Sequence, residues 1–377
     1  MRESTDGVRA RARDLGIRLG RLEPGRWNAI TDVAGVRVGH TTLISGEGPL
    51  VRGQGPVRTG VTVILPHAGD LGADPVFAGY HVLNGNGEMT GLPWIEESGL
   101  LTTPVAITNT HSVGMVRDAL ISYGLQRHGA DQALVWSLPV VAETYDGVLS
   151  DINGMHVRPE HVFAALDRAK DGPVAEGCVG GGTGMICHEF KGGIGTASRL
   201  LAPEKGGWTV GALVQANYGK REQLRVDGVP VGRELGPEVA PLPGVPVGDA
   251  GSIIVIVATD APLLPGQCRR LAQRATLGIA RMGGIGANSS GDIFLAFSTA
   301  NRGLGDTTDS VQPLAVRTLP PSAMTPLFEA TADTVEEAIL NAMCAAVTTT
   351  GLNGVVVHAL PLDRLREVLK SYKRLDS

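Results

Sequence analysis

The stretch that decides the fold begins with VDGVPVGRELGPEVAPLPGVPVGDAG (226–251) and continues directly into SIIVIVA (252–258). Proline and glycine dominate the first part, which has no apolar period, so we expect an exposed linker. The second part is a continuous β-branched run, typical of a strand that is buried on both faces. A structureless segment of this length is uncommon in a compact protein, and function or disorder is the usual reason for one.

Similar strand-like runs recur along the chain, with helix-like segments between them. Mixed strands and helices predict a layered α/β architecture. By its length, the chain could form two or three average domains or one large α/β domain. We expect strands at 60–65, 104–107, 133–137, 192–200, 208–215, 293–298 and 354–358, and helices at 113–126, 159–170, 264–282 and after a cap at Asp333 or Thr334.

Composition excludes several classes of protein. The 377 residues carry a net charge of −5 and no basic run, so nucleic acid is not an expected partner. The N-terminus, MRESTDGVRARARDLGIRLG, has no apolar core and is not a secretory signal. No segment approaches the ~20 apolar residues of a membrane helix. We therefore expect a soluble, cytoplasmic protein that does not enter a membrane.

Two features favour a cofactor only weakly. Cys187 and His188 are adjacent, but no second close pair completes a metal site, so small buried hydrophobic residues are the preferred interpretation of the cysteines. The glycines of GGGTGM (180–185) could cradle a phosphate, but no Walker lysine follows them. Close packing of the backbone is therefore preferred over nucleotide binding.

Most Gly-Ser pairs are ordinary turns, but the long linker before Gly251 and the apolar strand after Ser252 favour a junction suited to self-cleavage. The Ser252 hydroxyl can attack the carbonyl before it, and glycine has no side chain to oppose the distortion that this attack needs. Water would then hydrolyse the ester and leave Ser252 with a free α-amine. Because an α-amine has an ordinary pKa near ~7.7 to 8.0, it can act as the base that a weakly nucleophilic hydroxyl requires.

Motifs along nearly the whole chain resemble the L-aminopeptidase/D-esterase (D-amidase) family, which includes β-peptidyl aminopeptidases. They are NAITDVAGVRVGHTT (28–42), GVTVILPH (60–67), NGNGEMTGL (84–92), ITNTHSVG (107–114), VVAETYDGVLSDING (140–154), EGCVGGGTGM (176–185), GALVQANYG (211–219), GSIIVIVATDAPL (251–263) and GIGANSSGDIFLAFSTAN (284–301).

The resemblance implies a single domain over 1–377, a four-layer αββα sandwich that is similar to N-terminal nucleophile hydrolases but has different strand connectivity. It implies cleavage into fragments 1–251 and 252–377, which stay together, and a homotetramer of cleaved units. No metal or organic cofactor is implied. The expected substrates are short peptides and amino-acid amides and esters with a free N-terminal amine, including L-residues, D-alanine and β-amino acids.

The same resemblance assigns the catalytic groups. Ser252 matches the nucleophile, and Ser290 with Asp292 matches the pair that supports it, although family members often have Glu in place of Asp292. Asn217 matches an oxyanion donor, and Tyr145 a second group near the scissile carbonyl. Whether the base is the Ser252 amine or the Ser290/Asp292 pair is left open.

Two further residues are assigned to substrate binding. Glu143 matches the carboxylate that holds the substrate ammonium, and Trp136 is expected to wall the side-chain pocket. Without the resemblance, Asn217 reads as a turn cap, Tyr145 as a half-buried aromatic and Glu143 as a solvated charge. The alternative functions are an acyltransferase of the similar ornithine acetyltransferase fold, which cleaves itself at Thr, and a non-catalytic oligomeric binding protein.

Overall fold

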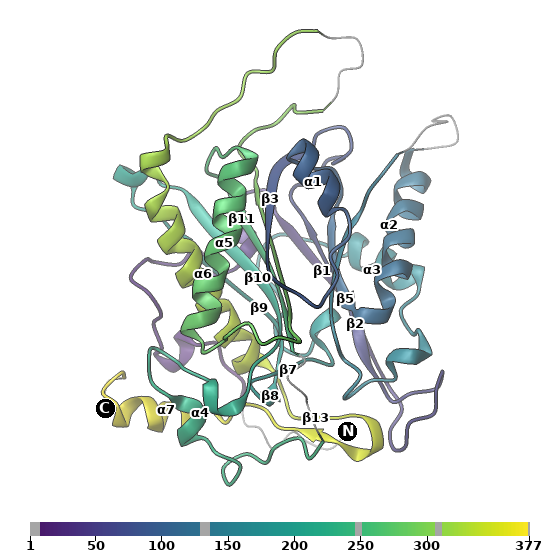
Figure 1. Ribbon diagram of the computed structural model, residues 1–377, viewed down its shortest axis with the longest axis vertical. Helices are drawn as coiled ribbons and strands as arrows, with labels where there is room; N and C mark the ends of the chain where they lie inside the picture. The colour runs from purple at the N-terminus through teal and green to yellow at the C-terminus, as the bar shows by residue number, and fades with distance from the viewer. Residues whose placement is uncertain (1–7, 129–135, 246–250, 306–310, 376–377) are drawn as a thin grey trace.

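The computed structural model describes residues 8–128, 136–245, 251–305 and 311–375. Figure 1 shows two β-sheets packed face to face, with α5 (Pro265–Arg281) and α6 (Thr325–Ala345) on the outer face of one sheet. Helices α2 (Val113–His128) and α3 (Pro159–Asp167) cover the outer face of the other. The layers are therefore helix, sheet, sheet and helix, which confirms the predicted αββα sandwich.

The larger sheet has six strands in the order β4-β3-β12-β11-β10-β9. Its central pair, β11 and β12, is parallel, and α5 provides the crossover connection that a parallel pair needs. The strands are β3 (Val76–Gly85), β4 (Leu100–Leu101), β9 (Gly193–Leu200), β10 (Thr209–Asn217), β11 (Ser252–Thr259) and β12 (Gly291–Ser298).

The smaller sheet has four strands in the order β1-β2-β5-β6. Strands β5 and β6 are parallel and are joined through α2, whereas the other pairs are antiparallel. The strands are β1 (Arg37–Ser45), β2 (Val57–Leu65), β5 (Val105–Asn109) and β6 (Val140–Thr144).

Strand β11 shows why its sequence is apolar throughout. Ile253 and Val255 pack into the cluster that the sheet forms with α5 and α6. Ile254 and Ile256 point the other way, into the cluster between the two sheets. Because side chains alternate along a strand, burial on both faces requires an unbroken apolar run. A third cluster fills the space between the smaller sheet and helices α2 and α3.

Shorter elements complete the chain, joined by 3₁₀ turns. They are α1 (Leu92–Ser98), α4 (Val231–Glu234), α7 (Leu362–Ser371), β7 (Ile186–Cys187), β8 (Phe190–Lys191), β13 (Thr349–Thr350) and β14 (Val356–Val357). In the ranges that the structure describes, the helices are all too short or too polar to cross a lipid bilayer.

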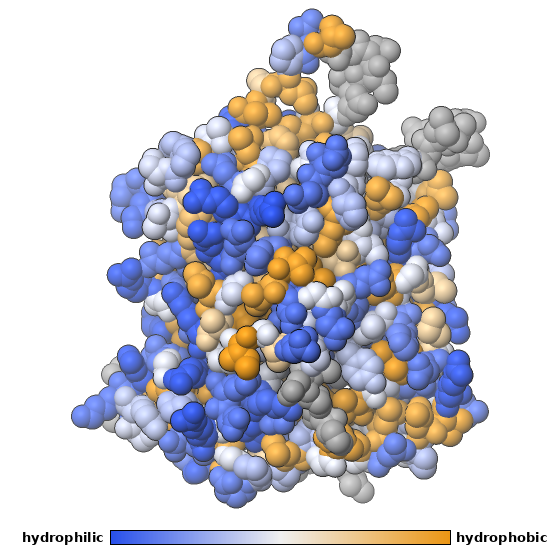
Figure 2. Space-filling view, in the orientation of Figure 1, coloured by the Kyte–Doolittle hydropathy of each residue, from blue (hydrophilic) through white to orange (hydrophobic). Residues whose placement is uncertain are grey.

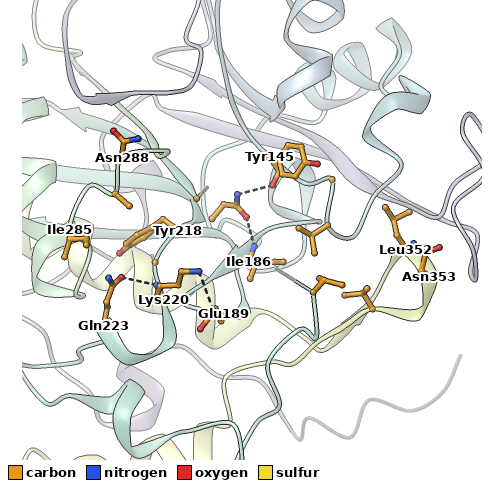
Figure 3. A pocket seen from close by; sticks show the side chains of 18 residues that line it. Tyr145, Ile186, Glu189, Tyr218, Lys220, Gln223, Ile285, Asn288, Leu352 and Asn353 are labelled. Carbon is orange, nitrogen blue, oxygen red and sulfur yellow. Dashed lines mark hydrogen bonds and ion pairs between the residues drawn. The ribbon is translucent and has the colours of Figure 1, made fainter. Parts of the chain in front are cut away.

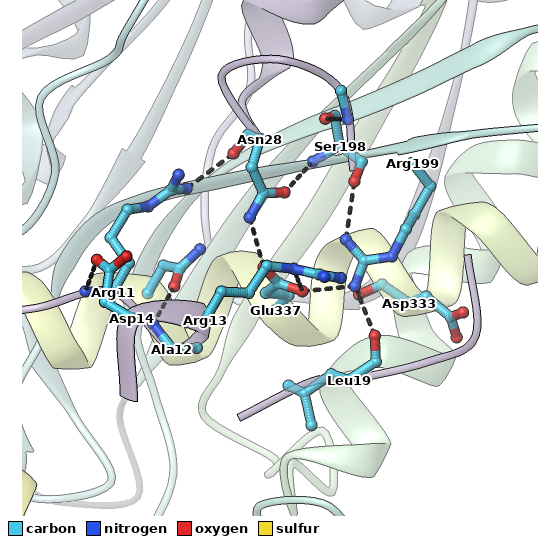
Figure 4. Close-up of polar contacts among 12 residues, drawn as sticks. Arg11, Ala12, Arg13, Asp14, Leu19, Asn28, Ser198, Arg199, Asp333 and Glu337 are labelled. Atoms are coloured by element: carbon cyan, nitrogen blue, oxygen red, sulfur yellow. Dashed lines mark hydrogen bonds and ion pairs between the residues drawn. The ribbon is translucent and has the colours of Figure 1, made fainter. Parts of the chain in front are cut away.

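A buried ion pair fastens the N-terminal segment to the larger sheet (Figure 4). Arg199 Nη2 lies 2.6 Å from Glu337 Oε2, and both side chains are completely buried. Arg13 pairs with the same carboxylate at 3.0 Å, and Asn28 Nδ2 donates to it. The ion pair therefore joins strand β9, helix α6 and two segments from the first thirty residues.

The segment 226–251 differs from the expected exposed linker. Val226, Val231, Leu235 and Ala240 are buried in the cluster beneath α5 and α6, and the short helix α4 lies within the segment. Arg221 donates hydrogen bonds to the carbonyls of Leu235 and Ala240. The expectation is therefore wrong for 226–240, because apolar side chains can be buried without a regular period. Residues 246–250 lie outside the described ranges.

Three element boundaries also differ. Helix α6 begins at Thr325, so Asp333 and Thr334 lie inside the helix and cap nothing; the Thr334 hydroxyl instead donates to the Ala330 carbonyl one turn earlier. The strand expected at 133–137 lies partly outside the described residues, and β6 begins only at Val140. The strand at 354–358 shrinks to Val356–Val357.

Candidate active site

Strands β10, β11 and β12 of the larger sheet come together at their ends, on one side of the sandwich that we call the site edge. Ser252 begins β11 and faces Asn217, the last residue of the antiparallel strand β10. On its other side Ser252 pairs with Gly291, the first residue of β12. The smaller sheet ends at the same edge, where Gln215 Nε2 donates to the Thr144 hydroxyl at 2.8 Å across the two sheets. The fold therefore brings Ser252 and Asn217 together from separate parts of the sequence.

The Ser252 side chain is buried at the start of strand β11. Only 7% of the residue is exposed, and its Oγ accepts a hydrogen bond from the Gly291 N–H at 3.1 Å. Gly251 precedes it in a tight space, where an added Cβ would lie 2.5 Å from the Tyr218 Cα. Because neighbouring backbone cannot move out of the way cheaply, glycine is the residue that fits at this position.

The Asn217 carboxamide is fixed at both ends. The Ile186 N–H donates to Oδ1 at 2.7 Å, and Nδ2 donates to the Tyr145 carbonyl at 3.0 Å. Since a backbone N–H can only donate and a carbonyl can only accept, these partners decide which end is oxygen and which is nitrogen. The nitrogen carries a second N–H, which is the group that an oxyanion would use.

Ser290 and Asp292 form the predicted pair. Ser290 Oγ donates to Asp292 Oδ1 at 2.6 Å, and both residues are buried. Burial raises the pKa of Asp292, while the Ser290 hydroxyl and the Ile253 N–H lower it. The shorter side chain of Asp therefore still reaches Ser290. While the Ser290 hydroxyl donates its hydrogen bond to Asp292, its oxygen keeps lone pairs that can accept a hydrogen bond from another hydroxyl.

Glu143 is a buried carboxylate near the same edge. It accepts hydrogen bonds from the Glu88 N–H at 3.0 Å and from the Thr110 hydroxyl. Gly87 lies between Glu143 and Gly291: an added Cβ on Gly87 would lie 3.1 Å from Glu143 Oε1 and 3.0 Å from the Gly291 Cα. Since Gly291 pairs with Ser252, the Glu143 carboxylate lies close to the start of β11. Burial raises the pKa of Glu143, and the Thr110 and Glu88 hydrogen bonds oppose the shift. Glu143 is therefore not a solvated surface charge.

A cavity of about 640 Å³ opens beside Asn217 and Gly251 (Figure 3). Tyr145 lies at its border with 44% of its surface exposed, and its hydroxyl packs over Gly147. The lining combines apolar side chains with polar ones and includes both Asn217 and Gly251. The lining residues are Tyr145, Gly147, Val148, Ile186, Glu189, Asn217, Tyr218, Gly219, Lys220, Gln223, Val245, Gly251, Ile285, Ala287, Asn288, Leu352, Asn353 and Val355.

The structure does not bring Trp136 to this cavity. Trp136 precedes β6, whereas Glu143 lies towards the end of that strand. Its ring packs edge-on against Trp94 at 5.2 Å and lines a different cavity, of about 700 Å³. Trp136 therefore does not line the cavity of about 640 Å³, and its expected place in the wall of the substrate side-chain pocket stays a prediction.

The sequence interpretation missed the groups that hold the predicted ones in place. These are the Thr110 hydroxyl on Glu143, the Gly291 N–H on Ser252 and the Ile186 N–H on Asn217. Thr110 and Gly291 lie inside motifs that were singled out, ITNTHSVG and NSSGD. Backbone donors such as that of Ile186 leave no signal in the residue type.

The weaker cofactor signals have structural explanations. Cys187 is completely buried, and burial raises the pKa of its thiol to about 12, as suits a small hydrophobic residue. Gly181 lies between the two sheets, where a Cβ would approach the Gln215 Oε1 to 2.2 Å and the Ile107 carbonyl to 2.7 Å. Close packing is therefore confirmed as the reason for this glycine.

Comparison with known proteins gives consistent matches over nearly the whole chain. The model of peptidase family S58 matches residues 28–357. The β-peptidyl aminopeptidase BapA of Sphingosinicella microcystinivorans is 53% identical, covering 97% of this chain and 93% of its own.

Two solved structures match the fold. A Burkholderia sp. β-aminopeptidase has a TM-score of 0.89 at 56% identity, covering 96% of this chain and 99% of its own. The L-aminopeptidase D-Ala-esterase/amidase of Ochrobactrum anthropi, described as a variant of the Ntn hydrolase fold, has a TM-score of 0.88 at 46% identity, covering 97% and 99%.

The fold, the residues at the strand ends and the named relatives all indicate the same class of protein. The chain is a serine aminopeptidase, a hydrolase that acts on peptide bonds. More specifically, the chain belongs to peptidase family S58. Neither the acyltransferase nor the non-catalytic alternative is favoured by these matches.

Proposed function

We propose that this aminopeptidase matures by cutting its own Gly251–Ser252 bond and then uses Ser252 as an N-terminal nucleophile. The observation that carries the proposal is the position of Ser252 at the first residue of β11, opposite Asn217 and beside the cavity that Gly251 lines. Fragments 1–251 and 252–377 would remain together, because β11 and β12 of the second fragment lie in one sheet between β10 and β3 of the first.

In maturation, Ser252 Oγ attacks the Gly251 carbonyl carbon and its proton passes to the Ser252 nitrogen as the C–N bond breaks. The product is an ester between Gly251 and the Ser252 oxygen, and water hydrolyses it to a Gly251 carboxylate and a free Ser252 α-amine. The carbonyl oxygen carries negative charge in both steps, and we expect the second N–H of Asn217, the one not bonded to the Tyr145 carbonyl, to stabilise it.

In turnover, the mature Ser252 hydroxyl attacks the carbonyl of the substrate's first residue. The tetrahedral oxyanion takes a hydrogen bond from Asn217, and the leaving amine or alcohol departs with a proton. Water then releases the residue from the acyl-enzyme. Two groups remain candidates for the base: the α-amine of Ser252, and Ser290 relaying the proton to Asp292, whose raised pKa makes it a better acceptor.

Glu143 accounts for the requirement for a free N-terminus. Its carboxylate is buried and hydrogen-bonded, and it pairs with no Lys or Arg in the part of the chain that the structure describes. A substrate ammonium would supply the missing charge, whereas an acylated amine would leave the carboxylate unpaired. Tyr145 would contact the scissile carbonyl from the cavity border.

The proposed substrates are short peptides and amino-acid amides and esters. The names of the relatives support β-amino acids and D-alanine as released residues, in addition to L-residues. A homotetramer of cleaved units and a cytoplasmic location complete the proposal; both rest on the family resemblance and the sequence.

The test compares unblocked alanyl p-nitroanilide with its N-acetylated form. We expect the purified protein to release nitroaniline from the unblocked substrate only. Equal rates on both substrates would contradict recognition of the ammonium. A β-alanyl anilide in the same assay distinguishes an enzyme that accepts β-residues from one restricted to α-residues.

A further inference from the structure

Lys191 is a buried cation behind the proposed oxyanion site. It ends β8, and its side chain is completely buried. Its ammonium donates to three backbone carbonyls, those of Met185 at 2.7 Å, Gly192 at 3.0 Å and Gly182 at 3.5 Å. None of these bonds goes to a carboxylate. Asp146 interacts with the ammonium electrostatically, but no carboxylate of the described residues is in contact with it, and burial lowers the pKa of Lys191. Because burying a charge without a carboxylate in contact is costly, the position calls for an explanation beyond packing.

The Met185 bond connects Lys191 to the proposed oxyanion donor. The Met185 carbonyl and the Ile186 N–H belong to one peptide group, so the ammonium binds its oxygen end. The hydrogen end of that peptide group donates to Asn217 Oδ1 at 2.7 Å. The Asn217 carboxamide is a second amide in series, and its Nδ2 carries the N–H proposed for the oxyanion.

Hydrogen bonds arranged in such a chain polarise one another in the same direction. A positive charge on the Met185 oxygen makes the Ile186 N–H a stronger donor. That donor withdraws charge from Asn217 Oδ1 and makes Nδ2 a stronger donor in turn. Such polarisation is worth most when negative charge develops on the substrate, which is the condition for accelerating a reaction.

We infer that Lys191 is a positioning residue that orients and polarises the Asn217 carboxamide through the Met185–Ile186 peptide group. The inference rests on the proposed function, in which Asn217 binds the oxyanion. Lys191 contacts neither substrate nor nucleophile. The rival explanation is that Lys191 only ties together the loop from Gly182 to Gly192, a role that would affect stability alone.

The test replaces Lys191 by Met, which keeps the length of the side chain and removes the charge. We expect the rate of self-cleavage and kcat for alanyl p-nitroanilide both to fall by about 10-fold or more, a part of the loss on removing an oxyanion donor. KM should change little, since Glu143 is untouched. If Lys191→Met does not fold, Lys191→Gln is judged by the same criteria.

Arg199→Met is the matched control. Arg199 is also a completely buried cation, but its bonds go to Glu337, Ser198, Leu19 and Asp333. We expect this variant to lower Tm while kcat stays within about two-fold of wild type. If Lys191→Met likewise lowers Tm and leaves kcat unchanged, the inference is overturned and Lys191 has a structural role only.

A double-mutant cycle with Asn217→Ala separates the two explanations further. If Lys191 acts through Asn217, Lys191→Met costs little in a chain that already lacks the carboxamide. The same fold-loss in both backgrounds would overturn the inference while Asn217→Ala still supports the proposed function. If Asn217→Ala alone leaves both rates unchanged, the oxyanion assignment fails first and the inference falls with it.

Inhibition by an amino aldehyde is a measurement that does not depend on the stability of the loop from Gly182 to Gly192. Its adduct with Ser252 carries an oxyanion, whereas the matching amino alcohol carries none. We expect Lys191→Met to weaken inhibition by the aldehyde about as much as it lowers kcat/KM, with the alcohol unaffected. Equal weakening of both inhibitors would contradict a role at the oxyanion.

Discussion

Asn217 and Ser252 face each other across β10 and β11, and the Asn217 carboxamide is held by hydrogen bonds from the Ile186 N–H and to the Tyr145 carbonyl. The pairing places an amide donor beside a hydroxyl at the end of a rigid sheet. Neither residue depends on a mobile loop for its position, since both belong to strands that are buried on two faces. Preorganised donors of this kind cost little reorganisation during reaction.

Replacing Ser252 by Ala should leave one uncut, inactive polypeptide. The hydroxyl is the proposed attacking group in both maturation and turnover, so no fragment should appear on a denaturing gel. Ser252→Cys provides the control, because a thiol retains a nucleophile of similar size. Two fragments from Ser252→Ala would show that another residue cuts the chain.

Replacing Asn217 by Ala should slow maturation and turnover together, by about 10²- to 10³-fold in kcat, because both reactions pass through an oxyanion. Time courses of fragment formation and steady-state kinetics measure the two rates. Asn341→Ala is the control: Asn341 is a buried amide that bonds to Ala12 and Thr196. That variant should lose stability and keep its rates; an Asn217 variant that behaves the same way would rule out the oxyanion role.

We expect kcat/KM to fall on the acid side (its acid limb) with an apparent pKa above the ordinary range of a glutamate, because of Glu143. The ionised carboxylate binds the substrate ammonium, so binding is lost as pH falls through the Glu143 pKa, which burial raises. Glu143→Gln should remove this limb and lower kcat/KM by about 30-fold or more, equivalent to about 2 kcal/mol for an unpaired buried charge. A pH profile of kcat/KM with its acid limb intact in Glu143→Gln would assign it to another group.

Asp292 should affect kcat and leave the binding of the ammonium unchanged. Asp292→Asn keeps the size of the side chain but removes the charge that accepts from Ser290. We expect kcat to fall with KM nearly constant, and Asp292→Glu to restore most of it, since Glu can make the same contact. Full kcat in Asp292→Asn would leave the Ser252 amine as the base and exclude the relay.

Much of the fold could be predicted because its signals are local. The apolar run from Ser252 to Ala258 identified a strand buried on both faces, and α2 and α5 follow their predicted ranges closely. Predictions failed where tertiary contacts decide the outcome. Helix α6 continues through Asp333, whose carboxylate pairs with Arg281 at 2.6 Å and caps no helix. The proline-rich segment is buried because the core accepts scattered apolar side chains.

The site was predictable in its residue types and less so in its geometry. The motifs named Ser252, Asn217, Glu143 and the Ser290/Asp292 pair, and the structure gathers these at one edge of the sandwich. Trp136 lines a cavity other than the one that Asn217 lines, a separation that the sequence motifs did not indicate. Lys191 was missed because its importance lies in backbone carbonyls that no sequence pattern displays.

The central claim concerns the bond between Gly251 and Ser252, and intact mass under denaturing conditions, combined with N-terminal sequencing, measures it directly. For fully active enzyme we predict two polypeptides, the smaller one beginning Ser-Ile-Ile. A single intact chain with full activity would contradict the account, because Ser252 would then have no free amine and the bond before it would not need to break.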